Sequence, residues 1–214
     1  MKKTTILFDL DGTLIDSTIA ILESFQFAFE SFGKKSPQDF QITKLIGHTL
    51  EDIFMKLGVD EKLVKQYVDT YKIHYFKISI AKTKFIKNAK KSIIKAHEFA
   101  NLGVVTTKTG SASKKLLEHF GVLQYFTAVI GREDVLEPKP APEPIYKAIE
   151  MINPTNANIW MIGDTTLDAK AAISANVNIA SVLCGYGKES DLREFSDNIF
   201  KDTLQAIEYI EAHT

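Results

Sequence analysis

The sequence predicts an α/β fold: a Rossmann-like parallel sheet with helices on both faces and an inserted helical cap. Two observations lead to this fold class. From residue 102 onward, short apolar runs alternate with helical patterns, which is typical of parallel strands joined by crossover helices. Residues 17–80, in contrast, carry only helical patterns. We therefore expect a core domain of residues 1–16 and 83–214 and a cap domain of residues 17–82.

The composition narrows the class of protein. Hydrophobic residues make up 45% of the 214 residues and charged residues 25%, as in ordinary folded domains. The formal net charge of −1 gives no reason to expect nucleic acid as a partner. No apolar run approaches the roughly 18 residues of a membrane span, so we expect no membrane partner. We expect a monomer or a homodimer.

The N-terminus and the cysteine usage suggest a cytoplasmic location. The apolar run after Lys2 and Lys3 ends at Asp9, which is too short for a secretory signal. The single cysteine, Cys184, excludes a disulfide framework within the chain and fits a reducing compartment. Its apolar neighbours suggest a buried spectator.

The first predicted strand covers residues 5–8, and two carboxylates follow it. Asp9 and Asp11 can face the same side of an extended chain, and Gly12 permits a sharp turn. Two like charges this close require a cation or a shared proton. A hard divalent cation with oxygen ligands, Mg²⁺ above all, suits them. The alternative interpretation is an Asp-rich turn that caps the next helix.

The expected cap begins at Ser17, which is well placed as the N-cap of a helix. Apolar residues at helical spacing continue to Gly33, and we interpret this aromatic stripe as core. Further helical stretches end near residue 47 and residue 58, and a longer one follows. His48 lies in a loop between two of them and is a candidate substrate contact, with an ordinary loop histidine as the alternative.

The rest of the chain predicts the alternating core. We expect strands at 102–107, 128–130, 158–162 and 179–183, and helices at 88–101, 111–120, 142–152, 167–174 and 203–212. A lysine-rich segment near residues 82–95 could be an anion-binding patch, but a solvated helix face explains it better. Ligands of such sheets bind beyond the carboxyl ends of the strands.

Polar residues gather at those strand ends. The hydroxyl of Thr106, together with the helix start near Ser111, could bind a phosphoryl oxygen. Lys139 stands between two prolines, which fix the backbone and hold one cation at the start of a helix. A proline-rich turn with a solvated lysine is the alternative.

The strand at 158–162 ends in another acidic segment. Asp164 follows Gly163 and can complete the oxygen shell of a metal held by Asp9 and Asp11. Asp168 could ligate the metal through water, or hold Lys139 or Asp164 in place. Either residue could instead be an ordinary helix cap.

These four segments resemble, in order, the four motifs of the haloacid dehalogenase-like hydrolase superfamily, and they span nearly the whole chain. The first motif, DxDGT, stands here as Asp9-Leu10-Asp11-Gly12-Thr13. The helical insert resembles the helical-cap subgroup, and the Leu-Ile-Asp-Ser that follows resembles its phosphoglycolate phosphatase-like members. The chain departs from these relatives at Phe85-Ile86-Lys87-Asn88, which stands in place of a usual Pro-Gly turn, and at Asn176, where Ala-Gly is usual.

The resemblance implies a Mg²⁺-dependent phosphatase of small phosphorylated metabolites. By position, Asp9 is the nucleophile that forms an aspartyl-phosphate, and Asp11 is the general acid and base. The remaining implied roles are phosphoryl binding by Thr106 and Lys139, further substrate contacts by Gly12, Thr107 and Lys108, and a metal site at Asp9, Asp11, Asp164 and Asp168.

Other activities stay open. Asp11 favours phosphoryl transfer over dehalogenation, because attack on carbon does not need it. A sugar-phosphate mutase of the beta-phosphoglucomutase kind, or a pyrophosphatase or nucleotidase, is the alternative enzyme, although Thr13 fits phosphatases better. A non-catalytic module that binds a phosphorylated ligand is a further alternative. We expect 2-phosphoglycolate as the first candidate substrate.

Overall fold

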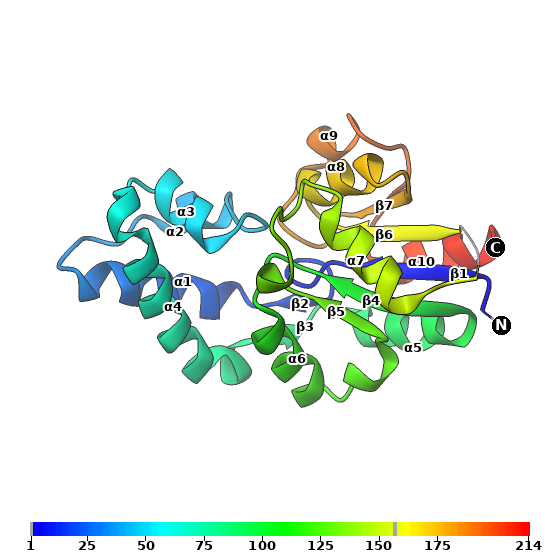
Figure 1. Ribbon diagram of the computed structural model, residues 1–214, viewed down its shortest axis with the longest axis horizontal. Coiled ribbons are helices and arrows are strands. Elements are labelled where there is room, and N and C mark those ends of the chain that lie inside the picture. The colour runs from blue at the N-terminus through cyan, green and yellow to red at the C-terminus, as the bar shows by residue number, and fades with distance from the viewer. Residues whose placement is uncertain (1, 156–157) are drawn as a thin grey trace. The chain divides into compact units, whose positions relative to one another are not determined.

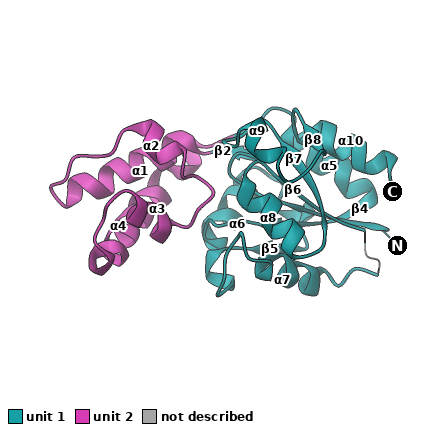
Figure 2. Cartoon of the chain, turned by 90° about the horizontal axis from the view of Figure 1, so that it is seen from above, with its two compact units in different colours: residues 1–16, 85–214 teal, residues 17–84 magenta. Residues whose placement is uncertain are grey.

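The computed structural model describes residues 2–155 and 158–214 (Figure 1). The chain forms two compact units, one of Met1–Asp16 with Phe85–Thr214 and one of Ser17–Lys84 (Figure 2). We call them the core unit and the cap unit. The second boundary was predicted at residue 82, and in the structure the cap unit ends at Lys84.

The core unit is built on a parallel sheet of six strands in the order β5-β4-β1-β6-β7-β8 (Figure 1). The predicted α/β fold is confirmed. The central strand β1 consists of buried residues throughout, as expected for a strand covered on both faces. The strands are β1 Thr4–Phe8, β4 Ala100–Val105, β5 Ala128–Ile130, β6 Ile159–Gly163, β7 Asn178–Val182 and β8 Ile199–Phe200.

Helices cover both faces of this sheet. Leu7 and Met161 pack in one cluster with Ile145 and Ala148 of α7 and Ala172 of α8. The helices α5 and α10 contact each other and pack on β4 and β7. The core helices are α5 Ala89–Phe99, α6 Gly110–His119, α7 Glu143–Ile152, α8 Thr166–Ser174, α9 Glu189–Leu192 and α10 Thr203–Ala212, with 3₁₀ turns η1 Leu123–Tyr125 and η2 Arg132–Asp134.

Two asparagines adopt the left-handed backbone conformation at turns next to core helices. Asn88 precedes α5 with a φ of 68°, and its side chain donates a hydrogen bond to Asp202 at 2.8 Å. Asn176 follows α8 with a φ of 55°. Asparagine tolerates the left-handed region better than most residues, so both turns form without glycine.

The cap unit contains only helices apart from the short strand at its end: α1 Thr18–Ser31, α2 Asp39–Thr43, α3 Leu50–Lys56 and α4 Glu61–Lys82. The predicted aromatic core is confirmed. Phe25 lies 4.7 Å from Phe54 and 4.9 Å from Tyr71 between ring centroids, and Phe29 lies 5.3 Å from Tyr67. Ser17 stands directly before α1 as predicted, but its side chain does not cap the helix.

Several boundaries differ from the prediction. The strand expected at 102–107 is β4, which begins at Ala100 because α5 already ends at Phe99. The two-stranded sheet of β2 Ile15–Asp16 and β3 Lys84–Phe85 was not predicted, and neither were β8 and α9. Elements of two to four residues are too short to carry a recognisable periodicity. Among the described residues, no helix combines the length and the apolar character of a membrane span.

Candidate active site

The pairing of β1 with β4 and β6 places the residues of the predicted motifs at one edge of the sheet. Phe8 is the last residue of β1 and pairs with Val104 of β4 on one side and Ile162 of β6 on the other. The residues after these three positions therefore emerge together at the carboxyl end of the sheet. Asp9 and Asp164 are the first carboxylates there, and both are buried.

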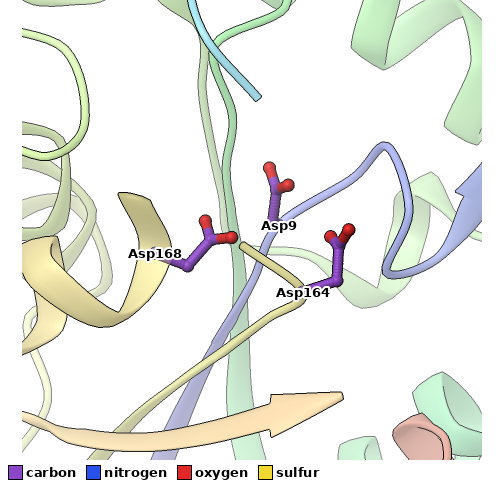
Figure 3. Close-up of side chains that lie close together, drawn as sticks. All are labelled: Asp9, Asp164 and Asp168. Atoms are coloured by element: carbon purple, nitrogen blue, oxygen red, sulfur yellow. The ribbon is translucent and has the colours of Figure 1, made fainter. Parts of the chain in front are cut away.

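Three carboxylates form a buried cluster at this edge. Asp9, Asp164 and Asp168 each offer an oxygen, and these oxygens lie within 4.8 Å of one another. Figure 3 shows the three side chains gathered where β1 and β6 end. The carboxylate of Asp11 lies outside this group and pairs with Lys108, with 3.1 Å between Nζ and Oδ2. A set of carboxylate oxygens so close together fits a hard divalent cation.

Lys139 is the cation of this cluster. Its Nζ lies 2.8 Å from Asp9 Oδ1 and 2.6 Å from Asp168 Oδ1, and it donates a hydrogen bond to Val105 O at 2.9 Å. The residue is only 5% exposed, which rules out the alternative of a solvated lysine in a proline-rich turn. The prolines around it place the chain at the start of α7.

Asp168 has both carboxylate oxygens engaged by protein groups. Oδ1 accepts from Lys139, and Oδ2 accepts from the backbone N of Thr165 at 3.0 Å and from its hydroxyl at 2.7 Å. The contacts with Thr165 cap helix α8, so the capping interpretation also describes part of what Asp168 does. Its other oxygen holds Lys139.

Asp164 is fixed by two donors, neither of which was predicted from the sequence to bind it. The hydroxyl of Thr13 donates to Oδ1 at 2.8 Å, and the backbone N of Tyr186 donates to Oδ2 at 2.8 Å. Two glycines make room for it, since a Cβ on Gly12 or on Gly185 would lie 2.3 Å or 2.0 Å from Oδ2. The Gly-Tyr-Gly segment after β7 was the available signal for the second donor.

Burial dominates the electrostatics. The pKa of Asp9 is raised to about 7, because burial raises it, Lys139 offsets part of that rise, and Asp168 adds to it. Burial, together with Asp168 and Asp9, also raises the pKa of Asp164 well above its usual value. Burial alone would lower the pKa of Lys139, but Asp168 and Asp9 outweigh it and raise that pKa. Three buried carboxylates thus face one ammonium group, and either bound protons or a further cation relieves their mutual repulsion.

The segment after β4 brings the remaining core candidates together. Thr106 is buried, and its Oγ1 accepts from Lys108 N at 3.2 Å. Thr107 follows it and is half-buried. We expected the N–H groups at the start of α6, near Ser111, to help bind a phosphoryl oxygen. In the structure they bind a carboxylate of the protein itself. The carboxylate of Glu133, which the sequence analysis did not identify, accepts hydrogen bonds from the first of them.

His48 and Cys184 were also singled out from the sequence, and His48 lies between α2 and α3 as predicted. His48 belongs to the cap unit, where Lys56 Nζ lies 3.0 Å from its Nε2. Burial and Lys56 lower the pKa of this imidazole. Cys184 is half-buried and not in purely apolar surroundings, because its Sγ contacts Gly12 O at 3.5 Å. Burial and nearby Asp164 raise the pKa of the thiol to about 12.

Comparison with known proteins identifies the family. A model of the haloacid dehalogenase-like hydrolases matches residues 6–182. The chain belongs to this family. It is 30% identical to a phosphoglycolate phosphatase of Aquifex aeolicus, covering 89% of this chain and 90% of that one. It is 32% identical to the pyrophosphatase PpaX of Halalkalibacterium halodurans, covering 91% and 90%. The predicted family, and its likeness to phosphoglycolate phosphatases, are confirmed.

Solved structures of the family share the fold. A haloacid dehalogenase-like family protein from Streptococcus pneumoniae superposes with a TM-score of 0.86 at 25% identity, covering 97% of this chain and 98% of that one. A predicted phosphatase from Clostridium acetobutylicum superposes with a TM-score of 0.88 at 26% identity, covering 99% of each. The chain is thus an enzyme of the hydrolase class that its four motifs indicated.

Proposed function

We propose that this enzyme is a Mg²⁺-dependent phosphatase of small phosphate monoesters that works through an aspartyl-phosphate, with 2-phosphoglycolate as the first candidate substrate. The contact between Asp9 and Lys139, 2.8 Å long and buried, carries the proposal. It holds a carboxylate in one orientation beside a fixed positive charge, as a nucleophile that attacks an anionic phosphoryl group requires.

The proposed reaction has two steps. A carboxylate oxygen of Asp9 attacks the phosphorus, the bond to the ester oxygen breaks, and Asp11 gives that oxygen a proton. Asp11 then takes a proton from water, and this water attacks the phosphorus of the aspartyl-phosphate. The bond between the phosphorus and the Asp9 oxygen breaks, which releases inorganic phosphate and restores both aspartates.

The surrounding residues bind and orient. Lys139 offsets the charge of Asp9 and of the phosphoryl oxygens, and Asp168, at 2.6 Å, keeps it in place. The hydroxyl of Thr106 binds a phosphoryl oxygen. Lys108 is paired with Asp11, so it holds the proposed acid and base in one orientation.

The metal site follows from the acidic cluster. We propose that Asp9, Asp164 and the backbone carbonyl of Asp11 would hold Mg²⁺, with Asp168 supporting the site through Lys139. When bound, the ion neutralises charge on the transferring phosphoryl group. Thr13 and Tyr186 orient Asp164 for this role through their hydrogen bonds to its two oxygens.

The substrate proposal draws on the relatives. One relative is named a phosphoglycolate phosphatase and another a pyrophosphatase, which makes pyrophosphate the second candidate. Both compounds carry a second anionic group next to the phosphoryl group, which a cation at this edge would suit. Gly12, Thr107 and Lys108 of the core unit and His48 of the cap unit remain the proposed substrate contacts. We also propose a cytoplasmic location and a cap unit that selects the substrate.

The test is the release of inorganic phosphate from a panel that contains 2-phosphoglycolate, pyrophosphate, nucleoside monophosphates and sugar phosphates. We expect release with Mg²⁺ and little after treatment with a chelator. Undiminished release without divalent cations would contradict the metal requirement. A product that keeps its phosphate would select the mutase, and no turnover of any compound would favour a binding module.

A further inference from the structure

Glu133 caps a helix of the active-site edge from a distant part of the chain. It lies in η2, after β5, and its carboxylate accepts hydrogen bonds from the backbone N of Gly110 at 2.9 and 3.0 Å and of Ser111 at 3.4 Å. These are the first two N–H groups of α6, which have no partner within the helix. Thr109, at the N-cap, makes no side-chain bond to them, and the first turn of α6 has no acidic residue.

Two backbone segments are joined at this point. The N of Arg132 donates a hydrogen bond to Lys108 O at 2.9 Å. A Cβ on Gly131 would lie only 2.1 Å from Gly110 N. The two backbone segments therefore approach more closely than a side chain at position 131 would allow. The segment at 131–133 is therefore docked against the segment at 108–110, and Glu133 closes the contact with charge-assisted bonds.

The segment at 106–110 carries side chains of the site. Its backbone N at Lys108 donates to Thr106 Oγ1 at 3.2 Å, and Lys108 Nζ lies 3.1 Å from Asp11 Oδ2. Movement of this segment would displace both the hydroxyl and the ammonium group. In addition, because Glu133 occupies the start of α6, a phosphoryl group has no free access to those two N–H groups.

We propose that Glu133 is a positioning residue of the active site. By capping α6 it fixes the segment at 106–110 and thereby the placement of Thr106 and Lys108 toward the substrate and Asp11. The inference rests on the proposed phosphatase function. In this reaction Glu133 would act only through the residues that it positions, without contacting the substrate.

Two measurements on the full chain test the proposal. Amide hydrogen exchange reports on the N–H groups of Gly110 and Ser111 whether or not the enzyme turns over. Steady-state kinetics with the best substrate of the panel separate kcat from KM. The variants are Glu133→Ala and the near-isosteric Glu133→Gln, whose amide oxygen still accepts a hydrogen bond. Glu118→Gln is the control, since it removes the same charge from an exposed position at the other end of α6.

We expect Glu133→Ala to exchange faster at the start of α6 and to lose about 10-fold in kcat, with a smaller change in KM, because misplacing a catalytic group lowers the chemical step. Glu133→Gln should lie between this variant and the wild type, and Glu118→Gln should match the wild type. Unchanged exchange, or unchanged kcat in Glu133→Ala with an active wild type, overturns the inference alone. A wild type that releases no phosphate from any compound overturns the proposed function and the positioning role together.

Discussion

The ammonium group of Lys139 lies 2.6 Å from the carboxylate of Asp168, and both side chains are buried. The same ammonium group contacts Asp9 at 2.8 Å. Two buried negative charges thus depend on one positive charge. Breaking a buried ion pair by removing one partner leaves an uncompensated charge, which costs far more than the pair contributes.

Removing the lysine should affect both stability and turnover. Lys139→Met should abolish phosphate release and lower the free energy of unfolding by about 3–5 kcal/mol near neutral pH. The loss should be smaller in acid, where Asp9 is protonated and no longer needs a positive partner. Urea unfolding at two pH values measures this, with Lys91→Met as the exposed control. Equal losses in the two variants would contradict this reading of Lys139.

Replacing Asp168, whose carboxylate holds Lys139, should lower the rate of turnover more than the stability of the fold. Asp168→Asn keeps the shape of the side chain but removes its charge, so Lys139 should lose its fixed orientation. We expect kcat to fall about 10- to 100-fold, as for other groups that orient an active-site residue. Asp197→Asn, at an exposed site, should leave kcat unchanged. A kcat of Asp168→Asn that equals the wild-type value would show that Lys139 needs no such support.

The turn after Asp11 should tolerate no side chain at Gly12. Its φ is +86°, and an added Cβ would lie 2.3 Å from Asp164 Oδ2. Gly121 has a φ of +66° but nothing within 4 Å of the added atom, so Gly121→Ala isolates the backbone effect. We expect about 1 kcal/mol of destabilisation from that control and a larger one, with loss of phosphate release, from Gly12→Ala. Similar stability and activity in both variants would show that the contact with Asp164 is unimportant.

The pKa values of the cluster predict how stability depends on pH. Burial raises the pKa of Asp9 to about 7 and that of Asp164 well above its usual value. The carboxyl groups of an unfolded chain titrate at about pH 4. Between that pH and neutrality, Asp9 and Asp164 therefore bind more protons in the folded chain than in the unfolded chain. Stability that comes from these two groups is therefore present in acid and is lost as the pH rises.

Thermal unfolding of the metal-free protein measures this effect. The melting temperature should fall more between about pH 5 and about pH 7.5 in the wild type than in Asp164→Asn. Added Mg²⁺ should raise the melting temperature more at the higher pH, because its ligands must be deprotonated. Parallel pH profiles of the two proteins, or equal stabilisation by Mg²⁺ at both pH values, would contradict the proposed metal site.

The sheet was predictable because each of its main strands is a short buried apolar run. Residues 5–8 and 158–162 stood out in the sequence, and the structure has Thr4–Phe8 and Ile159–Gly163. Strands β2, β3 and β8 have only two residues each, which is too few for any periodic signal. Pairing with a neighbour creates them, and that neighbour is not visible in the local sequence.

The residues of the site also divide into those with a local signal in the sequence and those without one. Asp9 and Asp164 stood out because each follows a short apolar run, and Lys139 stood out because prolines flank it on both sides. Glu133 and Tyr186 did not, because each acts through backbone N–H groups that only the folded chain brings close. Such contacts depend on the approach of two loops, and neither loop carries a periodic pattern.

The most direct test of the account is the fate of Asp9 during turnover. The wild type, mixed with Mg²⁺ and the best substrate of the panel, is stopped in acid, digested and analysed by mass spectrometry, with Asp9→Asn treated in parallel. We predict one added phosphoryl group on the peptide of residue 9 in the wild type, none in the variant, and phosphate release by the wild type alone. Phosphate release by Asp9→Asn at the wild-type rate would contradict the assignment of Asp9 as the nucleophile.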